Sequence, residues 1–141
     1  MKISLSKEDC IFCKIVKKEI PAKVFLENKE NLAFLDIFPI NKGHTVVITK
    51  RHYNNIEDIP EEQLSSLFKT VKEAAALIHN KLEIEGYNIL QNNFKAAGQE
   101  INHIHVHIIP RNTEDDKFKM KIPRNQAAEE ELSDILKLLK S

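Results

Sequence analysis

The stretch His103-Ile104-His105-Val106-His107-Ile108-Ile109-Pro110 places a histidine at every second position at the start of an apolar run. Successive side chains of a β-strand point to opposite faces of its sheet. The stretch therefore predicts a strand over residues 103–109 with three imidazoles on one face and apolar side chains on the other. The chain holds only six histidines, so three in alternation indicate a functional site.

Three interpretations of this histidine row are open. The first is a half-exposed strand whose outer face happens to carry histidine. The second is one metal ion bound by all three, but a rise of ~3.3 Å per residue puts His103 and His107 about 13 Å apart, too far to share one tetrahedral ion unless the strand breaks. The third divides the labour, because one neutral imidazole can attack a substrate while its neighbours hold that ring or the substrate.

The composition is that of an ordinary globular domain over residues 1–141, with 42% hydrophobic and 30% charged residues. Lys and Arg number 21 and are balanced by 21 Asp and Glu, so we expect no nucleic-acid or membrane partner. No apolar run reaches the ~18–20 residues of a membrane span. Residues 1–20 lack the apolar core of a signal peptide. We expect an intracellular, cytoplasmic protein.

Hydrophobic periodicity predicts the elements around the histidine row. The longest helix is expected after Pro60, where an apolar stripe runs from Leu64 to Leu82 and Gly86 stops it. A short helix broken at Pro21 is expected over residues 15–23, and a terminal helix over residues 127–139. Strands are expected at residues 23–28, 31–36, 44–50, 87–91 and 103–109. Together they predict an α+β fold with a largely antiparallel five-stranded sheet, one long helix and a C-terminal helix.

Several short motifs occur in order along the chain. They are Cys10-Ile-Phe-Cys-Lys-Ile, Glu19-Ile-Pro-Ala, Leu32-Ala-Phe-Leu-Asp36, Gly43-His44-Thr-Val-Val-Ile, Lys50-Arg51-His52, Asn92-Asn93, Ala97-Gly98-Gln99 and the histidine row with Arg111 behind it. Over nearly the whole chain this order resembles the histidine triad (HIT) family of nucleotide-binding hydrolases and transferases, and its small bacterial members most closely. The resemblance implies a HIT-like fold.

The resemblance also implies a reaction. The middle histidine of the row, His105, would attack the α-phosphorus of a nucleoside phosphoramidate or a dinucleoside polyphosphate and form a nucleotidyl-histidine intermediate. His107, and His44 from the neighbouring strand, would support the ring and the phosphate. A homodimer is implied as well, and the strand at residues 87–91 would otherwise leave an open apolar edge.

Nucleotide-binding residues follow from the same resemblance. Asp36 would bind the ribose hydroxyls, since a carboxylate can accept two hydrogen bonds. Asn92, Gln99 and the backbone near Glu100 would hold phosphate oxygens. An apolar slot for a purine base would comprise Ile11, Phe12, Ile15, Phe34, Leu35 and Ile37. Plain core packing is the alternative for Phe34 and Ile37, and a solvated strand end is the alternative for Asp36.

Two positions depart from the family pattern. Phe94 stands where many members have glycine, so the phosphate loop must turn without it. Glu100 stands where many members have a hydroxyl residue. An ionised carboxylate cannot donate a hydrogen bond, so it would repel phosphate or turn away, whereas its backbone N–H could still serve.

Cys10 and Cys13 form the only cysteine pair of the sequence. In a reducing compartment such a pair indicates a metal clamp or a redox pair. The redox reading lacks the βαβ context of thioredoxin-like motifs. The resemblance implies a structural Zn²⁺ site completed by His52 and His103.

Two other functions compete with direct attack by histidine. One is a purine nucleotide-binding regulatory module whose turnover is incidental. The other is zinc-dependent hydrolysis, which chelation would stop at once. With a polyphosphate substrate, Mg²⁺ could assist as a second cofactor by neutralising charge.

Overall fold

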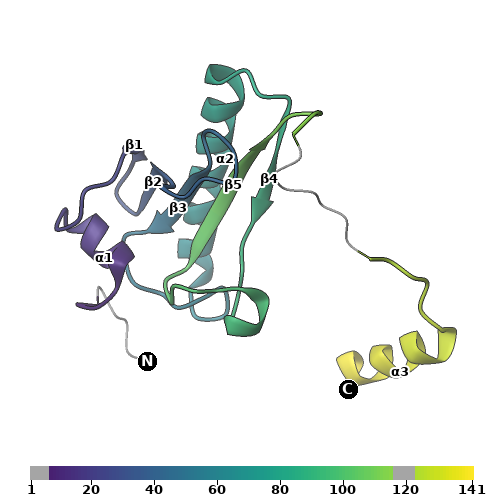
Figure 1. The fold of residues 1–141 in the computed structure, drawn as a ribbon. Coiled ribbons are helices and arrows are strands. Elements are labelled where there is room, and N and C mark those ends of the chain that lie inside the picture. The colour runs from purple at the N-terminus through teal and green to yellow at the C-terminus, as the bar shows by residue number, and fades with distance from the viewer. Residues whose placement is uncertain (1–6, 116–122) are drawn as a thin grey trace.

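The structure, a computed structural model, describes residues 7–115 and 123–141. Its five strands form one antiparallel sheet in the order β1-β2-β3-β5-β4 (Figure 1). Their bounds are β1 Val24–Glu27, β2 Asn31–Leu35, β3 Thr45–Thr49, β4 Gly86–Leu90 and β5 His105–Arg111. The predicted α+β fold is thereby confirmed.

The long helix α2, Glu61–Lys81, covers one face of the sheet. Its buried stripe, which includes Leu67 and Val71, packs on Val47 and Val106 of the central strands. The opposite face carries the short helix α1, Ile11–Val16, packed on a second set of strand side chains. Because side chains alternate along each strand, the apolar residues between the histidines point toward α2, and the histidines of β5 point toward α1.

The first helix lies earlier than the sequence predicts. It spans Ile11–Val16 and not residues 15–23, so that prediction was wrong. Cys10 caps it, because its Sγ accepts the backbone N–H of Cys13 at 3.4 Å. The helix stops before Lys18, whose φ of 66° lies in the left-handed region. The capped start brings both cysteines beside His103 and His52, which precede β5 and follow β3.

Strand β5 starts two residues later than predicted, at His105 and not at His103. His103 lies in the bend before the strand, and its N–H donates to the main-chain oxygen of Ile101 at 2.8 Å. Of the row, only His105 and His107 are therefore strand residues. The row is divided between two places: His103 lies beside Cys10 and Cys13, whereas His105 and His107 line a cavity.

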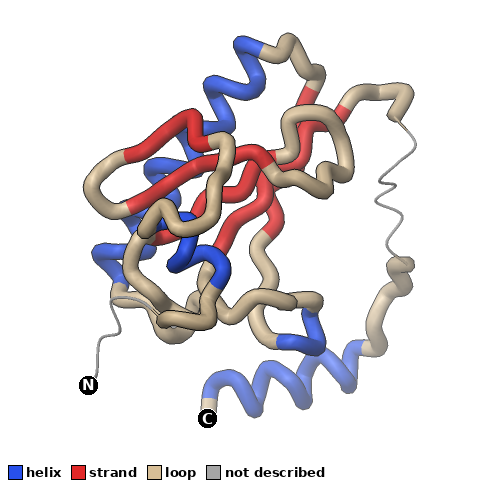
Figure 2. Tube along the Cα trace, turned by 60° about the vertical axis from the view of Figure 1, so that its left-hand side comes forward, coloured by secondary structure: helices blue, strands red, loops and turns tan. Residues whose placement is uncertain are grey.

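The C-terminal helix α3, Glu129–Lys140, lies close to its predicted range of 127–139 and stands away from the sheet (Figures 1 and 2). Its residues are exposed except Ser133, which is half-buried. Its apolar side chains follow helical spacing on one side: Leu132, Ile135, Leu136 and Leu139. In the described part of the chain, no helix has both the length and the apolar character that a membrane crossing requires.

Candidate functional site

His105 lies at the start of β5, beside α1. Its Nδ1 is 2.7 Å from the main-chain oxygen of His103. A carbonyl oxygen only accepts, so Nδ1 carries the proton and Nε2 keeps its lone pair. The ring of Phe12 meets the imidazole edge-on, with centroids 5.0 Å apart. These contacts fix the ring with one basic nitrogen available.

His44, which precedes β3, and His107 of β5 form a hydrogen-bonded pair. The backbone N–H of Ile40 donates to His44 Nδ1 at 3.0 Å, so a neutral His44 carries its proton on Nε2. That Nε2 lies 3.0 Å from Nδ1 of His107 and donates to it. His107 is then left with its own proton on Nε2, where it can be donated to a bound phosphate oxygen.

Burial favours the neutral form of these imidazoles. It lowers the pKa of His107 to about 4, with further lowering from His105 and His44. Burial also lowers the pKa of His44 and of His105, although the Asp36 carboxylate acts in the opposite direction on both. Neutral rings can serve as a nucleophile and as a hydrogen-bond donor near pH 7.

A cavity of about 430 Å³ opens beside His44, His105 and His107. It is lined by Asp36, Glu100 and all the residues expected in the base slot: Ile11, Phe12, Ile15, Phe34, Leu35 and Ile37. Phe34 is 6% exposed and also packs in the core, whereas Ile37 is 79% exposed and is not a core residue. A larger cavity of about 630 Å³ beside β1 contains none of the histidines, and its charged lining residues are Lys18 and Glu27.

Asp36 follows β2 at the mouth of this cavity. Its Oδ1 accepts the backbone N–H of Phe38 at 2.8 Å. Its Oδ2 lies 3.6 Å from His44 Nε2. The carboxylate is thus held in place, and it retains lone pairs that a diol can reach.

Gln99 holds the loop between β4 and β5. Its side chain is buried, accepts the Phe94 N–H at 2.8 Å, and donates to the main-chain oxygens of Asn54 and Ile101. The amide is therefore occupied by the loop itself, and Gln99 does not line the cavity. Direct contact of its side chain with phosphate stays a prediction.

The remaining loop residues lie around this anchor. Gly98 and Glu100 line the cavity, whereas Asn92 does not line it but lies beside Gly98. Phe94 adopts φ 71° and ψ 156°, a region that favours glycine. The loop thus keeps the conformation that glycine would permit, although a phenylalanine stands there.

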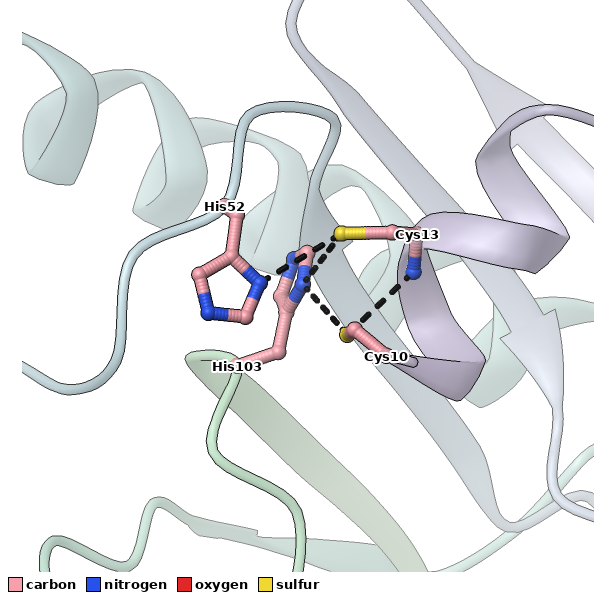
Figure 3. Close-up of side chains that lie close together, drawn as sticks. All are labelled: Cys10, Cys13, His52 and His103. Carbon is pink, nitrogen blue, oxygen red and sulfur yellow. Dashed lines mark hydrogen bonds between the residues drawn. The ribbon is translucent and has the colours of Figure 1, made fainter. Parts of the chain in front are cut away.

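The side chains of Cys10, Cys13, His52 and His103 converge beside α1 (Figure 3). Nδ1 of His103 lies 3.3 Å from the sulfur of Cys10 and 3.6 Å from that of Cys13, and Nδ1 of His52 lies 3.4 Å from the Cys13 sulfur. In a zinc tetrahedron with bonds of 2.3 Å to sulfur and about 2.0 Å to nitrogen, these separations are roughly 3.5 Å. All four residues are buried. The donor set and its spacing fit Zn²⁺.

The outer nitrogens of both candidate ligand rings also have partners. His103 Nε2 lies 2.8 Å from the main-chain oxygen of Thr49, and His52 Nε2 lies 3.1 Å from Asn54 Oδ1. Protons on these outer nitrogens leave each Nδ1 free to bind a metal. Sequence reasoning missed Thr49 and Asn54, because only the folded chain brings them to the rings.

Asp36, His44 and His107 are also close enough to be considered as metal ligands. Their hydrogen bonds argue against it. Nδ1 of His44 is occupied by the Ile40 N–H, and its Nε2 proton is shared with His107. A metal ion bound by this trio would have to displace the hydrogen-bonded pair.

Comparison with known families agrees with this geometry. The model of the HIT domain matches residues 17–114, more than half of the chain. The chain belongs to the HIT domain family. The resemblance noted in the sequence is thus confirmed, and the cysteine pair precedes the matched segment of the HIT domain.

Relatives within the HIT family span archaea, bacteria and fungi. An uncharacterized HIT-like protein of Methanocaldococcus jannaschii is 53% identical over 102 residues, covering 72% of this chain and 78% of the relative. The adenosine 5'-monophosphoramidase of Saccharomyces cerevisiae is 44% identical over 105 residues, covering 74% of this chain and 64% of the yeast protein. A crystal structure from Streptococcus mutans superposes with a TM-score of 0.91 at 34% identity, covering 96% of this chain and 86% of the other.

Proposed function

We propose that this protein is a nucleotidyl hydrolase that cleaves nucleoside phosphoramidates or dinucleoside polyphosphates at the α-phosphorus. The observation that carries the proposal is the fixed tautomer of His105. Its Nδ1–H is tied to the main-chain oxygen of His103, so the lone pair of Nε2 is available beside the cavity. The kinship with a protein named as a monophosphoramidase supports the same reaction class.

The chemistry proceeds in two displacements. For a phosphoramidate, the Nε2 lone pair of His105 forms a bond to the α-phosphorus, and the bond from phosphorus to the leaving nitrogen breaks. That nitrogen keeps the electron pair and takes a proton from water. Water then attacks the same phosphorus, the bond to Nε2 breaks, and its electron pair returns to the imidazole. The proton lost by the attacking water neutralises the hydroxide left by the first step, and the nucleoside monophosphate leaves. The Nε2–H of His107 donates to a phosphate oxygen in both steps.

In the same proposal, the cavity holds the rest of the nucleotide. The apolar slot around Phe12 and Phe34 accepts the base, which we take to be a purine. The Asp36 carboxylate accepts hydrogen bonds from the ribose hydroxyls. Backbone donors of the loop at Gly98 and Glu100, with the amide of Asn92, complete the phosphate contacts, and the Gln99 amide holds this loop in place.

We further propose that Cys10, Cys13, His52 and His103 hold one structural Zn²⁺. Four protein ligands leave no open position for water, so a zinc ion there supports the fold and supplies no hydroxide. Burial raises the pKa of the Cys13 thiol to about 11, so binding must displace its proton. Mg²⁺ would assist polyphosphate substrates alone, because a single phosphoryl group carries less charge.

The test of this function uses adenosine 5'-phosphoramidate as substrate. We expect release of AMP, and a rapid acid quench with labelled nucleotide should trap AMP on the peptide that contains His105. Hydrolysis should persist in EDTA for as long as the fold is intact. Tight nucleotide binding without AMP release would instead support the regulatory module, and product formation without labelled protein would show that water attacks directly.

We also propose a homodimer. The outer edge of β4 has no strand beside it in the described chain, and Tyr87 and Ile89 are exposed along it. The apolar stripe of α3 is exposed in the part of the chain that the structure describes. An isolated 12-residue helix is marginal in water, so a second copy is the simplest cover for it.

Light scattering at micromolar concentration should give about twice the chain mass of 16.3 kDa. Leu132→Asp with Leu136→Asp should raise the dimer dissociation constant at least about tenfold, because charge replaces two apolar contacts. Lys137→Asp, on the polar side of α3, serves as the control and should leave the dimer intact. A monomer mass for the unmodified protein would refute the dimer.

A further inference from the structure

The charges that line the cavity beside His105 are all of one sign. Asp36 and Glu100 are its two carboxylates, and no Lys or Arg is among the described residues that line it. Burial lowers the pKa of His44 and of His107, so these two rings supply hydrogen bonds but little positive charge. A leaving group with negative charge would therefore meet uncompensated carboxylates.

The two carboxylates differ in how they are held. Asp36 is bonded to the Phe38 N–H and lies against His44. Glu100 is exposed, and its carboxylate has no hydrogen bond or ion pair with any residue in the described ranges. Its backbone follows Gln99, whose three hydrogen bonds anchor the loop. Glu100 thus combines a fixed backbone position with a free carboxylate.

Glu100 also stands between the cavity and a neighbouring hollow of about 320 Å³. Ile11, Glu100 and Ile101 line both spaces. The hollow contains Asp9 and Lys7, whose charges oppose each other. Because Lys7 and Asp9 offset each other, the Glu100 carboxylate gives the lining of this hollow a net negative charge. A group attached to the phosphorus at His105 and extending out of the cavity here would pass the Glu100 carboxylate.

We propose that Glu100 is a specificity-determining residue that selects leaving groups by charge. It favours an amine leaving group that bears an additional ammonium and disfavours anionic leaving groups, including the second half of a dinucleoside polyphosphate. This inference rests on the proposed hydrolase function and narrows its substrate class. The proposal also gives the Glu100 carboxylate a role, although a carboxylate at this position is unfavourable for phosphate binding.

The test compares three adenosine 5'-phosphoramidates whose leaving amines share a three-carbon chain: one derived from 1,3-diaminopropane, one from n-propylamine and one from β-alanine. We expect kcat/KM to be at least about tenfold higher for the ammonium compound than for the carboxylate compound, and the ratio to shrink with added salt. Glu100→Gln should bring the ratio close to one, and Glu100→Lys should reverse it. Glu73→Gln, an exposed site on α2, is the control of equal charge change and should keep the wild-type ratio.

The results distinguish failure of the Glu100 proposal from failure of the hydrolase function on which it rests. If the unmodified protein hydrolyses none of the three compounds, the hydrolase proposal fails. If it hydrolyses all three at similar rates, the hydrolase stands and the role of Glu100 is refuted. Loss of selectivity in Asp36→Asn with no change in Glu100→Gln would also overturn it, because the selecting carboxylate would then be Asp36.

Discussion

Replacing His105 with Asn should abolish hydrolysis while nucleotide binding survives. Asn fills a similar space but offers no imidazole nitrogen to attack phosphorus. Removal of a covalent nucleophile costs several powers of ten in rate, and we expect a loss of about 10³-fold or more in kcat. The cavity keeps Asp36, Phe12 and Phe34, so the affinity for AMP measured by calorimetry should change little. No labelled nucleotide should remain on the variant after an acid quench.

His79→Asn is the matched control, because His79 lies exposed on α2, where its ring meets that of Tyr87, and it does not line the cavity of His105. Its turnover should equal that of the unmodified protein. Turnover near the wild-type rate in His105→Asn would remove His105 from the role of nucleophile. A parallel loss of AMP binding would show instead that the substitution disrupts the cavity.

The second large effect is expected from loss of the cysteine and histidine quartet. Cys13 is 1% exposed and its sulfur lies close to both candidate ligand rings. Cys13→Ala should lower the zinc content, measured by elemental analysis after purification without added metal, from one ion per chain to nearly none. Structural zinc sites contribute directly to folding free energy. We expect a loss of several kcal/mol, about 3–5, as when one partner of a buried polar network is removed.

Val71→Ala provides the comparison for this prediction. Val71 is also buried, but it packs between α2 and the sheet, away from the quartet. The variant should lose about 0.5–3 kcal/mol of stability through a cavity and keep its zinc. A protein that folds normally without zinc would leave the two cysteines free or redox-active.

The sequence predicted the sheet well where periodicity is strong. The helix from Pro60 onward and the strand at residues 44–50 are confirmed within one or two residues as α2 and β3. The first helix was misplaced, because its start depends on the sulfur of Cys10 acting as a cap, which apolar spacing does not reveal. Strand β5 was placed too early because the alternation of histidines continues through a bend in the backbone.

For the site, the sequence predicted which residues come together but not the hydrogen bonds that orient them. The sequence and its family resemblance supplied the histidines, the cysteines and the lining of the cavity. They could not supply the partners that set each tautomer, since the Ile40 N–H and the Thr49 oxygen reach His44 and His103 only in the fold. Nor could they show that the Gln99 amide donates to the main-chain oxygen of Asn54, because that bond joins segments remote in sequence.

The bend before β5 has a consequence for how this motif evolves. His103 and His105 are neighbours in the sequence, yet His103 faces Cys10 and Cys13, which lie 93 and 90 positions away. The link between His103 and His105 is a main-chain oxygen, which any residue can provide. The first histidine of the row should therefore be inherited together with the distant cysteines and not with its neighbour. On the zinc proposal, loss of the cysteines would remove the constraint of the metal on the His103 ring and leave its contact with the Thr49 oxygen, whereas His105 and His107 would keep their places beside the cavity.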